Sequence, residues 1–316
     1  MANRTLLHEG TLMINHRPYR DKEDLLQIGG LIRRAHAQAP HCNAWSFARF
    51  DIWAHRKIGD EQVHAKRDWQ QGLRLWEVEG GELAGAILFA NDHSAALIYD
   101  PDLRENVEPM LAWAEARYTE NGDPGKPLTI EALASNAFLE QSLRSRNYTR
   151  PEEHYIYRQK LLESERGEPV MLPDGFYVKS TETVAELRAF HRAVQAVFNF
   201  EDSVDVYRIL QQAPSYVPEL DLTLLTAEGE VAAFCTVWLD RESGVAEFEP
   251  VGTVPQYRKR GLGAALLADA SNRLRSVGCR MATVFSWSES VGANKLYAGA
   301  GLEEKDRLYS WRWQGA

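Results

Sequence analysis

Apolar residues recur along the chain with two kinds of spacing. Residues 21–37 predict a helix, because their apolar positions recur three and four residues apart and so share one face. Those positions are Leu25, Ile28, Leu31 and Ile32. Residues 83–89 form an apolar run after a glycine-containing turn at 79–82, which is typical of a buried strand. Helical spacing returns at 107–118, so helices and strands alternate in this part of the chain.

The same order of elements recurs further along the chain. Helices are predicted at 184–198 and 263–277, and strands at 231–239, 245–251 and 282–285. The inward positions of the two helices are Leu187, Phe190, Val194 and Val197, and then Leu266, Leu267, Ala270 and Leu274. A shift of 154 residues matches Pro101 with Pro255 and Arg104 with Arg258, and a shift of 148 aligns the turns at 81–82 and 229–230.

This recurrence predicts two related domains, at residues 1–163 and 175–316. The linker between them, residues 164–174, is marked by its charged residues, by Pro169 and Pro173, and by Gly175 directly after it. A length of 316 residues suits two domains of about 150 residues each.

Composition and charge narrow the class of protein. The net charge of −9 and the pI of about 5.6 argue against a general nucleic-acid binder, whose affinity would come from a basic surface. Cys42, Cys235 and Cys279 lack metal-ligand spacing, so we expect no metal site and a reducing compartment. The first residues lack the apolar stretch of a secretory signal, and no apolar run approaches about 18 residues. We therefore expect a cytoplasmic protein without a membrane partner.

The clearest candidate for a binding site is a loop that connects a predicted strand to a predicted helix. The loop reads Arg258, Lys259, Arg260, Gly261, Leu262, Gly263 and Ala264. A helix N-terminus leaves backbone N–H groups unpaired and carries partial positive charge, so it attracts phosphate. We expect the two glycines to let a pyrophosphate reach these amides and the basic side chains to add charge. The alternative is a plain strand–turn–helix connection, and neither a Walker nor a Rossmann signature is present.

The loop resembles motif A of the GNAT acetyltransferase superfamily. The family signature Arg/Gln-x-x-Gly-x-Gly/Ala falls on Arg258, Gly261 and Gly263. Residues 293–302 resemble motif B, with Tyr297 at the tyrosine of that motif. The resemblance covers about residues 176–313, and it departs from the family at Ser290, where asparagine is common, and at Leu302, where phenylalanine is common.

The resemblance implies an α/β (α+β) fold of two tandem GNAT-like domains, each a mixed, mostly antiparallel sheet flanked by helices. It implies acetyl-CoA as the cosubstrate and direct attack by an amine in a ternary complex. The strand of motif A is expected to splay from its neighbour, so that Thr253 and Val254 offer backbone groups to pantetheine. The change at Ser290 is expected to alter the pantetheine contacts.

Acetyl transfer also needs proton-transfer groups. An alkyl amine is only about one part in a thousand neutral at pH 7, so a base or a desolvating pocket must remove its proton. Glu249 is the first candidate for the base, acting through water, and Glu247 shares its strand parity and is the second. The alternative is that either carboxylate pairs with an arginine. Tyr297 matches the family tyrosine that protonates the thiolate, with core packing as the alternative role.

The acceptor is less clearly defined by the sequence. Aromatic and acidic residues that suit a cationic amine follow the helix at 184–198; they are Phe198, Asn199, Phe200, Glu201, Asp202 and Tyr207. An anchored surface loop is an equally good interpretation of them. Trp238 and Trp287 are candidates either for the cleft wall or for the core.

The N-terminal copy has lost the cofactor motif. On the 154-residue shift, Val107 stands at Gly261, Pro109 at Gly263 and Leu143 at Tyr297, so we expect this copy to bind no CoA. We expect it to support the fold and to complete the acceptor cleft instead.

These observations predict an N-acetyltransferase for a small-molecule primary amine. The alternatives are a protein N-terminal or lysine acetyltransferase, and a non-catalytic acyl-CoA-binding module. Two copies in one chain are expected to give either a monomeric pseudo-dimer or a homodimer.

Overall fold

The computed structural model describes the chain except for residues 1–13, 67, 163–168, 182, 200–202 and 316. The first half runs β1 (Ile14–Pro18), α1 (Lys22–Gln38), α2 (Phe47–His64), β2 (Leu73–Val78), β3 (Leu83–Asn91), β4 (Ser94–Tyr99), α3 (Val107–Asn121), β5 (Leu128–Leu133), α4 (Ala137–Ser145) and β6 (Tyr155–Leu161). The second half runs β7 (Phe176–Ser180), α5 (Val184–Phe198), α6 (Val204–Leu210), β8 (Tyr216–Thr226), β9 (Val231–Asp240), β10 (Val245–Thr253), α7 (Leu262–Ser276), β11 (Met281–Trp287), α8 (Val291–Gly299) and β12 (Glu303–Trp313).

The elements predicted from hydrophobic spacing are present. The helices predicted at 21–37, 107–118, 184–198 and 263–277 are α1, α3, α5 and α7, and the apolar positions predicted on α1 are buried. Local signals fix where they begin. Asp21 caps α1 by accepting from the Glu23 amide, and Thr183 forms a capping box with Glu186 at the start of α5.

Within the described residues, twelve strands form one continuous mixed sheet in the order β1-β2-β3-β4-β5-β12-β6-β11-β10-β9-β8-β7. Neighbouring strands are antiparallel, except that β4 pairs with β5 and β10 with β11 in parallel. The repeated order of elements and the mixed, mostly antiparallel sheet confirm the predicted fold class.

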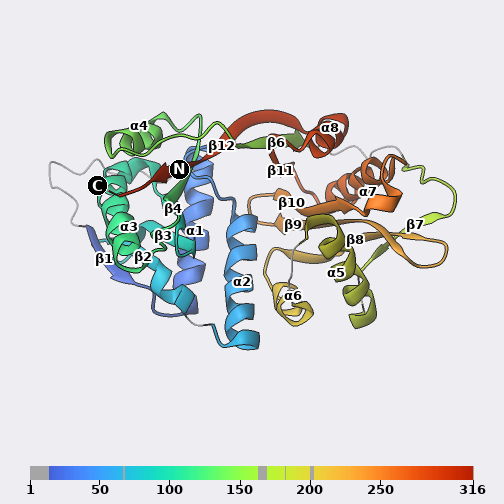
Figure 1. Cartoon of the computed structure of the whole chain (residues 1–316), viewed down its shortest axis with the longest axis horizontal. Helices are drawn as coiled ribbons and strands as arrows, with labels where there is room; N and C mark the ends of the chain where they lie inside the picture. The colour runs from blue at the N-terminus through green and yellow to red at the C-terminus, as the bar shows by residue number, and fades with distance from the viewer. Residues whose placement is uncertain (1–13, 67, 163–168, 182, 200–202, 316) are drawn as a thin grey trace.

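The last strand of each half crosses to the other half. β6 lies between β11 and β12, with Tyr155 opposite Trp287, and β12 continues onto β5, with Leu308 opposite Leu133. In Figure 1, β12 arches from beside α8 across to the N-terminal half. The sheet therefore joins strands that come before residues 164–174 to strands that come after them, and the domain boundary expected at those residues stays a prediction.

Helix α2 joins the two halves. It packs against α6, β9 and β10 of the second half, and stands between the halves in Figure 1. Gly59 permits the close approach, because a Cβ there would lie 2.9 Å from Cγ1 of Val206. Arg33 donates from Nε and Nη2 to the buried Asp240 carboxylate, at 3.0 and 2.9 Å. These contacts hold the halves in one arrangement.

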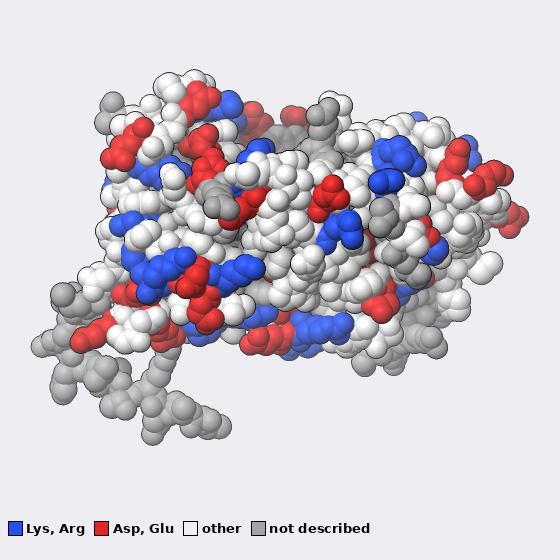
Figure 2. Space-filling model, turned by 90° about the horizontal axis from the view of Figure 1, so that it is seen from below, with Lys and Arg blue, Asp and Glu red and all other residues white. Residues whose placement is uncertain are grey.

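The described surface mixes both signs of charge. Viewed from below, basic and acidic side chains alternate over the described part of that face (Figure 2). No helix in the described ranges is long and apolar enough to cross a membrane.

Candidate active site

The sheet opens between β10 and β11. The two strands pair only from Val245 to Glu247, opposite Met281 to Thr283. The register of β10 against β9 then shifts between Phe248 and Val251. Beyond this bulge β10 follows β9 while β11 follows β6, so the neighbouring strands separate, as the family resemblance implies.

Backbone direction distinguishes the two residues predicted to hold pantetheine. The Val254 N–H donates to the Ala232 carbonyl at 2.9 Å, and the Val254 carbonyl accepts from the Tyr257 N–H at 2.9 Å. Since successive residues of an antiparallel strand direct these groups to opposite sides, the Thr253 N–H faces the opening. The geometry favours Thr253, whose carbonyl accepts from Arg258 Nε at 3.0 Å, over Val254 as the pantetheine contact.

The loop after β10 leads into an uncapped helix. Gly261 is the N-cap of α7 with φ of 79°, a left-handed conformation that favours glycine. No side chain caps α7, and the first helical bond runs from the Ala265 N–H to the Gly261 carbonyl, which leaves the amides of the first turn, including those of Gly263 and Ala264, as potential anion donors.

The structure gives Gly263 a packing role in addition to the expected one. A Cβ at this position would lie 3.2 Å from Cδ2 of Leu296 and 3.3 Å from Oγ1 of Thr253. Glycine therefore allows α7 to lie close to both β10 and α8. The close approach of these elements, rather than the access of phosphate alone, accounts for the second glycine of the motif.

The basic side chains of the loop are available to an anion. Arg258, Lys259 and Arg260 are exposed, and none of them forms an ion pair with a carboxylate within the described part of the chain. The Arg260 guanidinium lies 5.5 Å from the centroid of the Tyr257 ring. Ser290 is the N-cap residue of α8 without a side-chain cap bond, and its contact with pantetheine stays a prediction.

The two predicted carboxylates lie beside the opening. Glu249, at the bulge, is exposed to solvent inside a cavity lined by both halves. Desolvation by the cavity walls, and then the neighbouring Glu247, raise the pKa of Glu249 to about 7, against the opposing effect of Arg49 and Arg56. Glu247 is only 3% exposed, and burial raises its pKa while Arg49 and the Ser46 hydroxyl, which donates to Oε2, oppose the shift.

Tyr297 lies on α8 and is 6% exposed. Burial, and then the nearby Glu249 and Cys235, raise the pKa of Tyr297 well above its ordinary value. Its hydroxyl therefore stays protonated over the whole range in which Glu249 titrates. That is the protonation state a proton donor needs.

A cavity of about 560 Å³ lies between the two halves. Glu247 and Glu249 line it from β10, and Phe198, Tyr207 and Trp238 line it from the second half, as anticipated for the acceptor. Trp238 also donates from Nε1 to the Glu249 carbonyl. Trp287 packs edge-on against Tyr155, with ring centroids 5.0 Å apart. Phe200, Glu201 and Asp202 lie outside the described residues.

The opposite wall of this cavity comes from the N-terminal half. Trp45, Arg49, Trp53 and Arg56 line it from the start and one face of α2, and Tyr155 lines it from β6. None of these residues was predicted from the sequence. Arg49, Trp53 and Arg56 are spaced i, i+4, i+7 and so share one helix face. Because two of the three are arginines, this face lacks the helical spacing of apolar residues by which the other helices were predicted.

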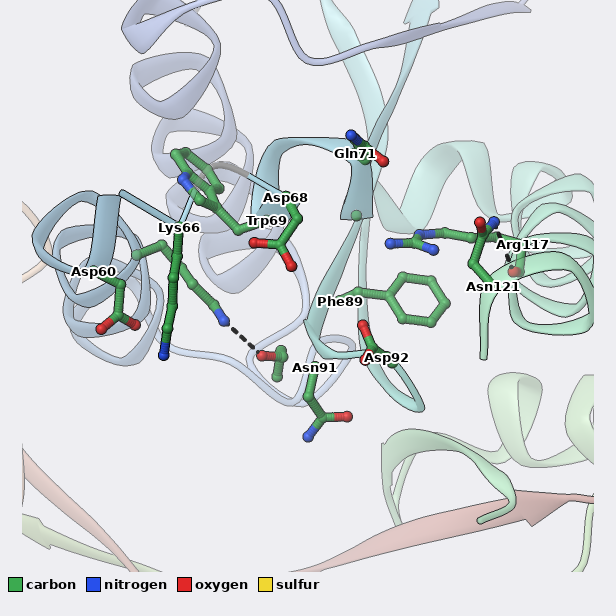
Figure 3. Close-up of a pocket in the computed structure, with 13 residues that line it drawn as sticks. Asp60, Lys66, Asp68, Trp69, Gln71, Phe89, Asn91, Asp92, Arg117 and Asn121 are labelled. Atoms are coloured by element: carbon green, nitrogen blue, oxygen red, sulfur yellow. Dashed lines mark hydrogen bonds between the residues drawn. The ribbon is translucent and has the colours of Figure 1, made fainter. Parts of the chain in front are cut away.

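A second cavity, of about 400 Å³, lies within the N-terminal half (Figure 3). Lys57 there donates to the Ala90 carbonyl at 2.8 Å, and the Arg117 guanidinium lies 4.8 Å from the Phe89 ring centroid. Three basic and three aspartate side chains balance one another around it. Among the described residues, no group of three or more His, Cys, Asp or Glu could hold a metal ion.

The N-terminal copy repeats the opening but not the glycine-containing start of the helix that follows it. β4 and β5 pair only over Ser94–Ala95, yet α3 begins 155 residues before α7, so Gly263 corresponds to Glu108 rather than to Pro109. Glu108 forms an ion pair with Arg146 at 3.2 Å. A carboxylate of the protein therefore occupies the first turn of α3.

Comparison with known proteins agrees with this geometry. The family model described as Acetyltransferase (GNAT) family matches residues 187–302. The matched residues 187–302 thus belong to a GNAT acetyltransferase domain. An aminoglycoside N(6')-acetyltransferase type 1 of Stenotrophomonas maltophilia is 35% identical over 94 residues, covering 27% of this chain and 61% of that protein. The uncharacterized N-acetyltransferase MJ1207 of Methanocaldococcus jannaschii is 32% identical over 85 residues, covering 26% and 37%. The chain thus spans less than two thirds of either relative.

Solved structures extend the likeness over the whole chain. A GCN5-related N-acetyltransferase from Sphaerobacter thermophilus superposes with a TM-score of 0.65 at 20% identity, covering 96% of both chains. A tandem GNAT protein from the clavulanic acid biosynthesis pathway gives 0.64 at 16% identity, covering 95% of this chain and 98% of that one. At such identities the likeness concerns the fold, which is a tandem GNAT fold.

Proposed function

We propose that this GNAT acetyltransferase uses acetyl-CoA to acetylate a primary amine of a small molecule, by direct attack in a ternary complex. The observation that carries the proposal is the convergence at one opening of the sheet. The Thr253 amide, the uncapped start of α7, Glu249 and Tyr297 all belong to the elements that border it.

The residues support a complete proton balance. Glu249, with a pKa of about 7, is partly ionised at neutral pH and accepts the proton of the ammonium group through water. The nitrogen then attacks the thioester carbonyl, a C–N bond forms and the C–S bond breaks. The thiolate that leaves takes the proton of the Tyr297 hydroxyl. The acylated nitrogen gives up its second proton, which restores that hydroxyl through water, and Glu249 releases its own proton to solvent, so one proton is released overall.

The cavity supports an acceptor with one amino group on an apolar body. Its rings, including Trp45, Trp53 and Trp238, offer flat apolar surfaces, and Glu247 and Glu249 favour a cation. Arg49 and Arg56 line the same cavity and would repel further positive charges. An aminoglycoside, named in one relative, is therefore the second candidate acceptor.

Two other functions compete with this proposal. A protein N-terminal or lysine acetyltransferase would use the same chemistry on a larger acceptor. A non-catalytic acyl-CoA-binding module would need neither Glu249 nor Tyr297, so the presence of both beside the opening favours turnover.

Transfer of radiolabelled acetyl from acetyl-CoA to a panel of amines tests the proposal. The panel contains aromatic monoamines, polyamines, aminoglycosides and amine-bearing peptides. Labelled product from a small amine, lost in a Glu249→Gln, Tyr297→Phe double variant that still binds acetyl-CoA, is the expected result. Binding of acetyl-CoA without transfer to any amine would favour the non-catalytic module.

A further inference from the structure

We infer that the opening between β4 and β5, which corresponds to the opening between β10 and β11, anchors residues 42–49. This segment in turn completes the catalytic centre in the other half. Asn43, Ser46 and Arg49 are the positioning residues of this segment, and they act on Glu247 and Glu249. The inference rests on the proposed function for its kinetic consequences, whereas its structural part stands on contacts within the chain.

The open edge of β4 is filled by a side chain of the protein itself. The Asp100 N–H donates to the Ala84 carbonyl at 2.9 Å, so the backbone groups of Tyr99 face away from β3, toward the opening beside β5. Asn43, which is 2% exposed, donates from Nδ2 to the Tyr99 carbonyl and accepts from the Tyr99 N–H, both at 3.1 Å. The 154-residue shift places Tyr99 on Thr253. The side-chain amide of Asn43 thus hydrogen-bonds both the N–H and the carbonyl of Tyr99. Its counterpart Thr253 is the residue whose N–H faces the opening beside β11.

A second amide secures the same segment. Asn136, the N-cap of α4, donates from Nδ2 to the Cys42 carbonyl at 2.6 Å and to the Tyr99 hydroxyl at 2.7 Å. The chain just before α2 is therefore fixed at Cys42 and at Asn43. Asn43 and Asn136 both hydrogen-bond Tyr99, the residue of β4 that faces the opening beside β5.

The start of α2 follows three residues later and reaches the carboxylates. Ser46 is the N-cap of α2 and accepts from the Arg49 N–H at 3.0 Å. The same hydroxyl donates its proton to Oε2 of Glu247. One side chain therefore both begins the helix and holds a carboxylate of β10, so a displacement of the helix start also displaces Glu247.

Arg49 is held by the N-terminal half and faces the same carboxylates. Its Nη2 donates to Oε1 of Glu131 on β5 at 3.2 Å, and Trp45 Nε1 donates to Oε2 of that residue at 2.8 Å. The Arg49 guanidinium lies 5.6 Å from the ring centroid of Trp45 and 5.0 Å from that of Phe285. Glu131 and these two rings hold the guanidinium in the wall of the cavity between the two halves.

The permanent positive charges that face Glu249 in the described structure come from α2. The charged or titratable groups around Glu249 are Glu247 on its own strand, Arg49 and Arg56 on α2, Tyr155 on β6 and Tyr297 on α8, with His191 of α5 lining the same cavity. Glu131 and Tyr157 face Glu247. Arg49 lowers the pKa of both Glu247 and Glu249 against burial, so its loss raises both.

The pH dependence of kcat/KM and a glutamate titration test the inference together. The acid limb of kcat/KM should move upward by about one pH unit in Arg49→Met. Arg49→Lys keeps the charge and should restore most of the limb. Ser46→Ala and Asn43→Ala should shift it in the same direction by less, although Asn43 does not line the cavity. Lys57→Met, on the same helix but beside the other cavity, is the matched control and should leave the limb unchanged.

A second readout separates this inference from the proposed function. The side-chain ¹³C signals of labelled Glu247 and Glu249, assigned with Glu→Gln variants, report their titration without turnover, and calorimetry with acetyl-CoA verifies that each variant is folded. Unchanged titration in Arg49→Met and Asn43→Ala overturns the inference, whatever the activity. A kcat/KM profile of Glu249→Gln that still levels off near pH 7 refutes the base assignment, while shifted titration in Arg49→Met and Asn43→Ala still supports the anchor.

Discussion

Glu249 combines two properties that a base for an amine needs. It is reachable from the cavity, and the surrounding protein raises its pKa to about 7. A carboxylate with an ordinary pKa would be too weak a base to remove an ammonium proton efficiently. The register shift of β10 between Phe248 and Val251 places this residue where β10 and β11 separate.

Glu249→Gln should alter the shape of the pH profile. In the unmodified enzyme kcat/KM should rise with pH while the carboxyl ionises and level off above about pH 7. The variant lacks this base, so its rate should be lower by roughly two to four powers of ten near neutrality and rise steadily as the amine itself becomes neutral. Steady-state rates from pH 5.5 to 9.5 measure this. A larger loss in Glu247→Gln than in Glu249→Gln would assign the base to Glu247.

Tyr297→Phe should reduce turnover without weakening cofactor binding. The hydroxyl matters mainly when the thiolate leaves, so kcat should fall about a hundredfold while the dissociation constant of acetyl-CoA stays nearly the same. Stopped-flow rates of the chemical step and calorimetry check the two quantities. An unaltered rate of the chemical step would leave Tyr297 with its packing role in the core.

At the scale of elements, α7 and α3 differ in what their first turns offer to an anion. Both helices have 15 residues and follow a strand that separates from its parallel neighbour. α7 starts from a left-handed glycine and has no acidic residue in its first turn, whereas α3 carries Glu108 there. A carboxylate at a helix N-terminus is stabilised by the same partial positive charge that would attract a phosphate.

Gly263→Pro should abolish acetyl-CoA binding, because it removes a backbone N–H from the first turn of α7 and forces a ring against Leu296 and Thr253. Pro109→Gly in α3 should change binding little, since Glu108 and Arg146 remain in place. Titration calorimetry should give one site per chain for the unmodified protein and for Pro109→Gly. Two sites in either protein would contradict this asymmetry.

At the scale of the whole molecule, the exchange of β6 and β12 makes each half depend on the other. β12 of the second half lies between β5 and β6 of the first half, and β6 lies between β12 and β11 of the second half. Neither half keeps a complete sheet when it is separated from the other. The exchange inside one chain also supports the proposal that the protein acts as a monomeric pseudo-dimer.

The full chain should unfold in a single cooperative transition despite its two copies. Tryptophan fluorescence and far-ultraviolet circular dichroism in urea should give coincident curves. A fragment of residues 175–316 should show no cooperative transition, because β11 and β12 lose the strand between them. Two separate transitions in the full chain would indicate halves that fold independently.

The sequence by itself determined the local elements and the family. Three- and four-residue spacings identified α1, α3, α5 and α7, and the glycine and tyrosine motifs identified the GNAT domain. These features depend on neighbouring residues along the chain, which is why one sequence reveals them. The repeat was also visible, although the residue opposite Gly263 required the true start of α3.

Only the tertiary structure decided which residues from distant parts of the chain meet. α2 was not predicted, because it lacks a simple apolar face. Its residues Arg49 and Arg56 line the cavity between the halves, and its buried Asp51 accepts a hydrogen bond from the Ser215 N–H of the other half. The exchange of β6 and β12 left no local signal, since a strand looks the same beside either partner. The choice between Thr253 and Val254 depends on which side of β10 pairs with β9. Each of these outcomes is set by contacts between residues far apart in sequence, and these contacts appear only when the whole chain packs.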